Sequence, residues 1–229
     1  MADSPGDPGL IAIVGAGGVG GLLGGQLARA GRAVHLLTRG AALAAIRARG
    51  VIVRGPDGEH AAPLARVADD PAALGPAAIV VVAVKTWQLA ALAPALAPLV
   101  GDGAVVIPVQ NGVEASEALA AALGDGPVIG GVARMLSWTE RPGEIRWQGL
   151  APSLVIGPRR ASQRAAVERA AAALAVPGVD IVVSERIEVE RWTKLVFIAS
   201  VAAVGAVTGA PIGGFRDRKS TRLNSSHQI

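Results

Sequence analysis

The sequence predicts an α/β fold, in which a doubly wound parallel sheet is followed by the start of an all-helical second domain. Three observations predict this class. The apolar run Leu10–Val14 ends in a glycine-rich turn. A second apolar run, Ala77–Val84, is uninterrupted, which is typical of a strand buried on both faces of a parallel sheet. Up to Val183, segments of strand and helical pattern alternate with short turns between them, as βαβ units require.

A G-x-G-x-x-G motif, made by Gly15, Gly17 and Gly20, lies where the first predicted strand passes into the first predicted helix. In a Rossmann-type fold this turn presents backbone amides to a pyrophosphate at a helix N-terminus. We expect Gly15 to permit the tight turn, Gly17 the close approach of the phosphates, and Gly20 the packing of the helix Val19–Ala30. Together with Gly18, these glycines are predicted to bind a dinucleotide cofactor.

The second strand, Ala33–Leu37, is predicted to select the cofactor. A fold that prefers NAD usually carries Asp or Glu about 20 residues after the glycine motif, where it holds the ribose 2′-hydroxyl. The first acidic residue downstream of the turn is Asp57, and the end of the strand offers Arg39 instead. A cation at this place suits a 2′-phosphate, so the sequence predicts NADP(H).

The remaining elements follow from local patterns. A helix is predicted at Ala41–Arg49, and a hairpin-type excursion at Val51–Val67 around GPDGEH. The helix Gln88–Leu99 should be kinked or shortened by Pro94 and Pro98. The other predicted elements are strand Ala104–Val109, turn Gln110–Gly112, helix Glu114–Leu123, strands Val128–Met135, Glu144–Trp147 and Leu154–Ile156, helix Ala161–Leu174 and strand Val179–Val183.

A domain boundary is predicted near Ser184. Residues 8–184 would form the NADP-binding domain, and residues 185–215 the first part of a truncated helical domain that supplies substrate-binding and catalytic groups. The segment Leu195–Gly214 has no charged residue across a length that could span a bilayer, but it holds four glycines and a proline. We favour a buried helix over a transmembrane span. Residues 216–229 lose the apolar periodicity and resemble translated sequencing-adapter read-through, so we expect a non-native tail rather than a natural polar one.

Composition excludes several classes of function. The net charge of the 229 residues is only +4 despite a pI near 10.6, and there is no basic stripe, which argues against nucleic-acid binding. The absence of cysteine excludes disulfides, Cys-ligated zinc and thiol nucleophiles, and no metal site is predicted. The N-terminus lacks the features of a signal peptide. We therefore expect a cytoplasmic protein that acts neither at a membrane nor on nucleic acid.

Polar side chains follow two of the predicted buried strands. Lys85 comes directly after the run that ends at Val84, and Asn111 follows the strand Ala104–Val109. Ligands of open α/β sheets bind at the carboxyl ends of the strands, so both should face the crevice of the glycine turn. Carbonyl reduction also needs a proton donor. No histidine is well placed, but Lys194, at the start of the uncharged segment, could serve if burial lowers its pKa.

Five motifs together resemble the ketopantoate reductase (2-dehydropantoate 2-reductase) family. They are GAGGVGG at Gly15–Gly21, Arg39, VKTWQ at Val84–Gln88, QNGVE at Gln110–Glu114 and RWTKLVF at Arg191–Phe197. The resemblance covers about residues 10–214. It implies NADPH-dependent reduction of 2-dehydropantoate to (R)-pantoate, a step toward pantothenate and coenzyme A.

The resemblance also implies roles for single residues. Lys194 would be the general acid, Lys85 and Asn111 would line the cofactor and substrate crevice, Gln88 would contact the cofactor, and Arg39 would bind the 2′-phosphate.

The chain also departs from the family pattern. Several members carry asparagines one and two turns after the lysine, where this chain has Ile198 and Ala202. Reduction of another 2-oxo acid therefore stays open. So do a non-catalytic NADP-binding fragment, because of the truncation, and a homodimer of the full-length form.

Overall fold

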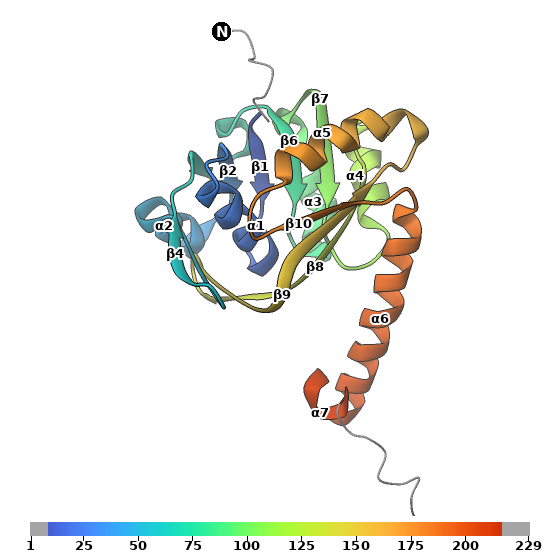
Figure 1. Ribbon diagram of the computed structural model, residues 1–229. Helices are drawn as coiled ribbons and strands as arrows, with labels where there is room; N and C mark the ends of the chain where they lie inside the picture. Colours follow the sequence, from blue (N-terminus) through green and yellow to red (C-terminus); the bar gives the residue numbers. More distant parts are fainter. Residues whose placement is uncertain (1–8, 217–229) are drawn as a thin grey trace, which may run out of the picture.

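The alternating strands of the first part of the chain form a parallel sheet of five strands. Their order is β5 (Arg66–Ala68), β2 (Val34–Leu37), β1 (Ile11–Val14), β6 (Ala77–Val82) and β7 (Val100–Pro108). The computed structural model describes residues 9–216 (Figure 1). All four neighbouring pairs of strands are parallel, so their carboxyl ends lie at one edge of the sheet. The predicted fold class is confirmed.

Helices cover both faces of this sheet, as a doubly wound fold requires. On one face, Ala12 and Val14 pack among residues of α3 (Thr86–Leu92), η2 (Ala93–Leu99) and α4 (Ala115–Leu123). On the other face, Ile11 and Ile13 pack among residues of α1 (Gly18–Arg29) and α5 (Arg164–Leu174). The predicted helix Gln88–Leu99 is a short α-helix that continues as a 3₁₀ helix, because prolines interrupt it as expected.

A second sheet lies outside α1, which the sequence did not predict as a separate layer. It joins β10 (Asp180–Val183), β9 (Glu144–Gly157), β3 (Val51–Gly55) and β4 (Gly58–Ala62), and β8 (Gly130–Arg141) pairs with β9. The predicted hairpin is confirmed as β3 and β4. The prediction of two strands, Glu144–Trp147 and Leu154–Ile156, was wrong, because β9 is one strand that pairs with β8 on both sides of a register shift between Gln148 and Ser153.

Small residues allow α1 to lie between the two sheets. The helix contacts β1 and β2 on one side and β3, β4, β8 and β9 on the other. A Cβ at Gly21 would lie 2.6 Å from Cγ1 of Ile145, and one at Gly25 would lie 2.6 Å from Cγ2 of Val53. Such distances are too short for real side chains, so glycine at these positions sets the spacing between α1 and the second sheet.

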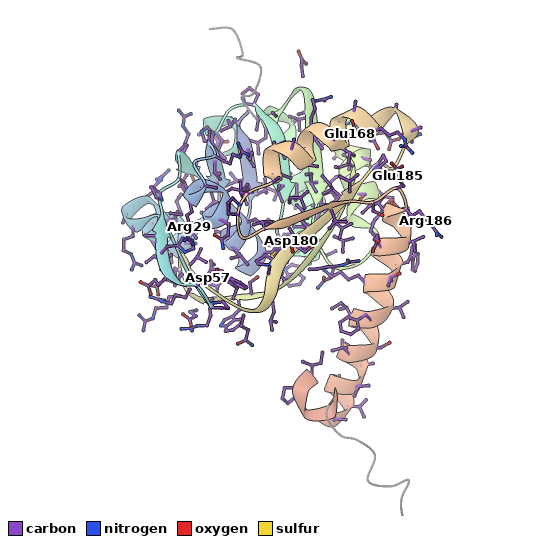
Figure 2. All side chains as sticks on the ribbon, in the orientation of Figure 1. Arg29, Asp57, Glu168, Asp180, Glu185 and Arg186 are labelled. Atoms are coloured by element: carbon purple, nitrogen blue, oxygen red, sulfur yellow. The ribbon has the colours of Figure 1, made fainter. Side chains whose placement is uncertain are left out.

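The last long helix, α6 (Ile187–Thr208), extends away from the body of the molecule (Figures 1 and 2). The helix contacts β8 and β9, and its buried residues, Ile187 and Arg191, lie in its first turns, which we call the foot of α6. The predicted boundary near Ser184 falls between β10 and this helix. The prediction that Leu195–Gly214 is buried was wrong. Only 6% of the most apolar window of α6 is buried, because beyond its foot the helix has little of the described chain to pack against. By length and composition alone, α6 is the one described helix that could cross a membrane.

Short elements complete the described chain. They are α2 (Gly40–Arg49), η1 (Pro71–Ala73), η3 (Ala161–Gln163) and α7 (Ile212–Arg216). Helix α2 confirms the prediction for Ala41–Arg49. The segment predicted to be non-native is residues 216–229. All of it after Arg216 lies outside the described residues.

Candidate functional site

A cleft of about 990 Å³ opens where β1, β6 and β7 end. The N-terminus of α1 and the start of α3 form one side of it, and residues of β8 and α6 form the other. Three charged side chains line the cleft, Lys85, Arg134 and Lys194, and none of the lining residues carries a carboxylate. Its charge therefore suits an anionic ligand such as a nucleotide or a 2-oxo acid.

The three motif glycines occupy three different environments. Gly15 has a φ of +105°, which lets the chain turn sharply after β1. A Cβ at Gly20 would meet the backbone oxygen of Gly15 at 2.0 Å, so this glycine is needed for close packing of the turn. Gly17, the N-cap of α1, has open space where its Cβ would point. Gly17 and Gly18 line the cleft at the N-terminus of α1, and their binding of a pyrophosphate stays a prediction.

Lys85 lies three residues after the end of β6, and it lines the cleft beside Thr86 and Trp87. It is also the N-cap residue of α3. Its backbone amide donates a hydrogen bond to Oε1 of Gln88, 3.1 Å away. Gln88 does not line the cleft in the described chain, and its carboxamide caps the helix. Its predicted contact with a cofactor stays a prediction.

Asn111 is exposed at the cleft on the turn after β7, and this turn is held by its neighbours. Nε2 of Gln110 donates hydrogen bonds to the backbone oxygens of Val82 and Val84, both 3.0 Å away. Oγ1 of Thr86 donates to the backbone oxygen of Asn111 at 3.5 Å. The ends of β6 and β7 are thereby tied together, which places Asn111 next to the segment that carries Lys85.

Lys194 reaches the cleft from α6, opposite the strand ends. Its Nζ donates a hydrogen bond to the backbone oxygen of Ala133 on β8. Burial, and to a lesser extent the nearby positive charge of Arg134, lower the pKa of this ammonium from 10.5 to about 8. Arg134 itself forms an ion pair with Glu190. This lowered pKa brings Lys194 closer to the range that suits general acids near neutral pH, and its role as a proton donor stays a prediction.

Arg39 lies away from the cleft lining. It is exposed at the end of β2, where it is the N-cap residue of α2. In a dinucleotide fold this is the place of the adenosine ribose, so the position agrees with the predicted contact without testing it. His35 lies within β2 and bonds to the backbone oxygen of Leu74, away from the cleft.

Sequence reasoning missed the wall that β8 contributes to the cleft. Arg134, Met135 and Ser137 line the cleft from this strand. Nothing in their local sequence indicates it, because β8 reaches the cleft through the second sheet. From α6, Ile198 lines the cleft four residues after Lys194, whereas Ala202 is exposed and does not line it.

Comparisons with known proteins agree with this geometry. Residues 11–161 match the family model described as ketopantoate reductase PanE/ApbA. The chain is 31% identical over 204 residues to a 2-dehydropantoate 2-reductase from Halobacterium salinarum, covering 89% of this chain and 67% of that protein. It is 27% identical over 206 residues to the uncharacterized oxidoreductase YkpB from Bacillus subtilis, covering 88% of this chain and 66% of that one.

Among solved structures, that of 2-dehydropantoate 2-reductase from Porphyromonas gingivalis superimposes with a TM-score of 0.84 at 26% identity. The match covers 92% of this chain and 76% of that one. The chain thus spans about two thirds of the length of these two curated relatives.

Proposed function

Because the chain belongs to the ketopantoate reductase PanE/ApbA family, we propose that it reduces a 2-oxo acid with NADPH, and that this acid is 2-dehydropantoate. The product would be (R)-pantoate, on the route to pantothenate and coenzyme A. The observation that carries the proposal is the placement of Lys194. Its ammonium group is partly buried, has a pKa of about 8, and lines the same cleft as Gly17 and Asn111.

The chain's own residues would divide the work of binding. The amides at Gly17 and Gly18 would bind the pyrophosphate, and Arg39 would bind the 2′-phosphate. Lys85 would pair with the substrate carboxylate or a cofactor phosphate, and Asn111 would hydrogen-bond to the nicotinamide ribose or the substrate. The absence of carboxylates from the lining residues supports this assignment, because two anions must share one cleft.

Lys194 would supply the proton. When bound, the reduced nicotinamide provides a hydride for the carbonyl carbon of the substrate. The carbonyl oxygen gains negative charge as this bond forms, and Nζ of Lys194 would donate its proton to that oxygen. The hydrogen bond to Ala133 would hold the ammonium in place during the transfer. Lys194 then regains its proton from solvent. The carbonyl has thus received one hydride from the cofactor and one proton from Lys194.

The test is turnover by the purified chain, followed as loss of NADPH absorbance with 2-dehydropantoate. We expect Lys194→Ala to lower kcat by about 10²- to 10⁴-fold, the usual contribution of a general acid. NADPH affinity, measured by fluorescence titration, should be unchanged, because the glycine turn lies on another element. Normal turnover by Lys194→Ala would remove Lys194 from the mechanism.

A second candidate is reduction of another 2-oxo acid on the same site. It is favoured by Ile198, an apolar side chain in the cleft wall where several family members carry asparagine. A panel of 2-oxo acids with hydroxylated and apolar side chains separates the two. A higher kcat/KM for an apolar acid than for 2-dehydropantoate would select the second candidate.

The third alternative is a binding fragment without activity. NADPH binding without turnover, together with activity of a version extended to the length of the relatives, would support it.

A further inference from the structure

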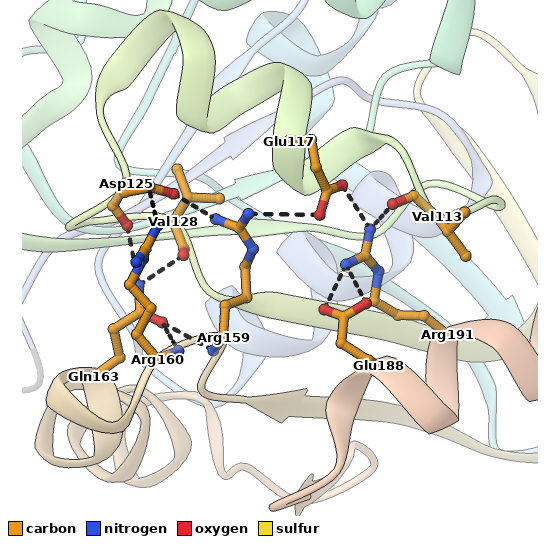
Figure 3. Close-up of polar contacts among 9 residues, drawn as sticks. All are labelled: Val113, Glu117, Asp125, Val128, Arg159, Arg160, Gln163, Glu188 and Arg191. Atoms are coloured by element: carbon orange, nitrogen blue, oxygen red, sulfur yellow. Dashed lines mark hydrogen bonds and ion pairs between the residues drawn. The ribbon is translucent and has the colours of Figure 1, made fainter.

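Arg191 is a buried cation at the foot of α6, outside the candidate cleft. Only 3% of its side chain is exposed. Its Nη1 donates to both carboxylate oxygens of Glu188, at 2.7 and 2.9 Å. Its Nη2 donates to the backbone oxygen of Val113 and, at 3.1 Å, to Oε2 of Glu117 (Figure 3). The guanidinium thus joins α6 to two segments that precede it by more than 70 residues.

These contacts link the two sides of the candidate site. Val113 lies two residues after Asn111 on the turn that follows β7, and Glu117 lies on α4. Lys194 follows Arg191 by three residues, which is close to one turn of the helix. A displacement of the foot of α6 relative to the turn would therefore move Lys194 relative to Asn111.

The other end of the same turn is fixed independently. Gln110 holds it to the end of β6 through Val82 and Val84, and Thr86 bonds to the backbone oxygen of Asn111. Arg191 supplies the remaining connection, from Val113 to α6. The turn therefore links the strand end that carries Lys85 to the helix that carries Lys194.

The geometry of its partners explains why an arginine, and not an apolar residue, occupies position 191. Burying a guanidinium has a desolvation cost, and apolar side chains of similar volume often replace buried ion pairs without loss of stability. The planar, pre-organised fork of a guanidinium binds a backbone carbonyl and two carboxylates in fixed directions at once. Arg191 has these three partners, so it specifies an orientation as well as filling space.

We propose that Arg191 is a positioning residue, which fixes α6, and with it the Lys194 ammonium, against the turn that carries Asn111. The catalytic consequence rests on the function proposed above. The anchoring of Lys194 does not, and it can be measured without turnover.

The test compares three variants. Arg191→Met keeps the length of the side chain but removes its donors, Arg191→Lys restores one cationic donor group, and Arg164→Met is the control. Arg164 forms an exposed ion pair with Glu185, which lies just before α6 (Figure 2), so its loss removes a surface ion pair without touching the contacts of Arg191. Circular dichroism and NADPH affinity confirm that each variant is folded.

The first measurement is the pH dependence of Lys194 labelling by an amine-reactive reagent, quantified by mass spectrometry. Labelling reports the deprotonated amine. Arg134 on β8 and Glu190 on α6 are unchanged in every variant, and Arg191→Lys keeps the positive charge at position 191, so it separates loss of that charge from loosening of the helix. We expect a midpoint near pH 8 in the unsubstituted chain and in Arg164→Met. In Arg191→Met the midpoint should move toward 10.5, because a loosened helix exposes the ammonium to water.

The second measurement is turnover. We expect Arg191→Met to lower kcat by about 100-fold, as misplacement of a catalytic group by about 1 Å can do, with little change in the KM for NADPH. Arg191→Lys should recover part of the loss. A labelling midpoint and a kcat equal to those of Arg164→Met would overturn the proposal.

A fallback covers the case in which Arg191→Met does not fold. The double variant Glu117→Gln, Glu188→Gln weakens both carboxylate contacts and retains the bond to Val113. Removal of two carboxylates by itself lowers the pKa of a nearby ammonium, so a labelling midpoint that rises would report a loosened helix, and one that does not rise would count against the proposal. If the unsubstituted chain shows no turnover, the proposed function fails, while the labelling experiment still decides the role of Arg191.

Discussion

The Nζ of Lys194 lies 2.5 Å from the backbone oxygen of Ala133, so a residue of the exposed helix α6 is held on β8 of the second sheet. An ammonium has three donors, and this bond uses one of them. The other two remain available to a ligand in the cleft. Strand β8 therefore does two things at this site. It provides the acceptor that holds Lys194, and its residues form one wall of the cleft.

The first prediction concerns the pH dependence of reduction. Lys194 must be protonated to donate a proton, and its pKa is lowered to about 8. We expect kcat/KM to be constant below about pH 8 and to fall by about tenfold per pH unit above it. Arg134→Gln removes a positive charge that disfavours the ammonium, so the fall should begin at a higher pH. A profile that stays flat up to about pH 10 would exclude Lys194 as the acid.

The second prediction concerns the choice of cofactor at Arg39. If its guanidinium binds a 2′-phosphate, Arg39→Ala removes charge-assisted hydrogen bonds of about 1.5–3 kcal/mol, which corresponds to about 10- to 100-fold in affinity. The dissociation constant for NADPH should rise by this factor, and that for NADH should not change. Arg164→Ala, which removes an exposed arginine elsewhere, is the control. Equal losses for both cofactors would contradict the assignment.

The sequence predicted the parallel sheet and much of the site because both depend on local patterns. Apolar runs of strand length identify β1 and β6, and the carboxyl ends of parallel strands converge. For this reason Gly17, Lys85 and Asn111 were expected to meet, and all three line one cleft. Their roles in binding remain predictions.

The second sheet and the environment of α6 could not be predicted in the same way. Pairing of β3 with β9 brings Ile52 beside Glu144, far apart in sequence, and no local pattern reports such a contact. The sequence predicted two strands where the structure has one, β9, and Gly149, with a φ of +90°, lies in the register shift of its pairing with β8. The apolar composition of α6 indicates that it suits burial, but does not specify what covers it. Arg134 was missed because it reaches the cleft from β8.

The third prediction separates the structural glycines from the binding glycine. Gly25→Ala would place a Cβ 2.6 Å from Val53, so we expect a loss of about 1–3 kcal/mol in the free energy of unfolding, measured by denaturant titration. Gly17→Ala meets open space and should leave this free energy nearly unchanged. It should instead weaken NADPH binding, because the added methyl group points into the cleft region. Tight NADPH binding by Gly17→Ala would place the pyrophosphate elsewhere.

The fourth prediction separates two roles of Gln88. Its Oε1 accepts a hydrogen bond from the backbone amide of Lys85, so Gln88→Ala should lose about 1 kcal/mol of stability, the usual value of a helix cap. Gln88→Glu keeps an acceptor at the same place and should remain as stable as the unsubstituted chain. A carboxylate near a bound phosphate would be repelled, however. If Gln88 also contacts the cofactor, Gln88→Glu should weaken NADPH binding, and added salt should partly restore it. If both variants bind NADPH as the unsubstituted chain does, Gln88 acts only as the cap that orients Lys85.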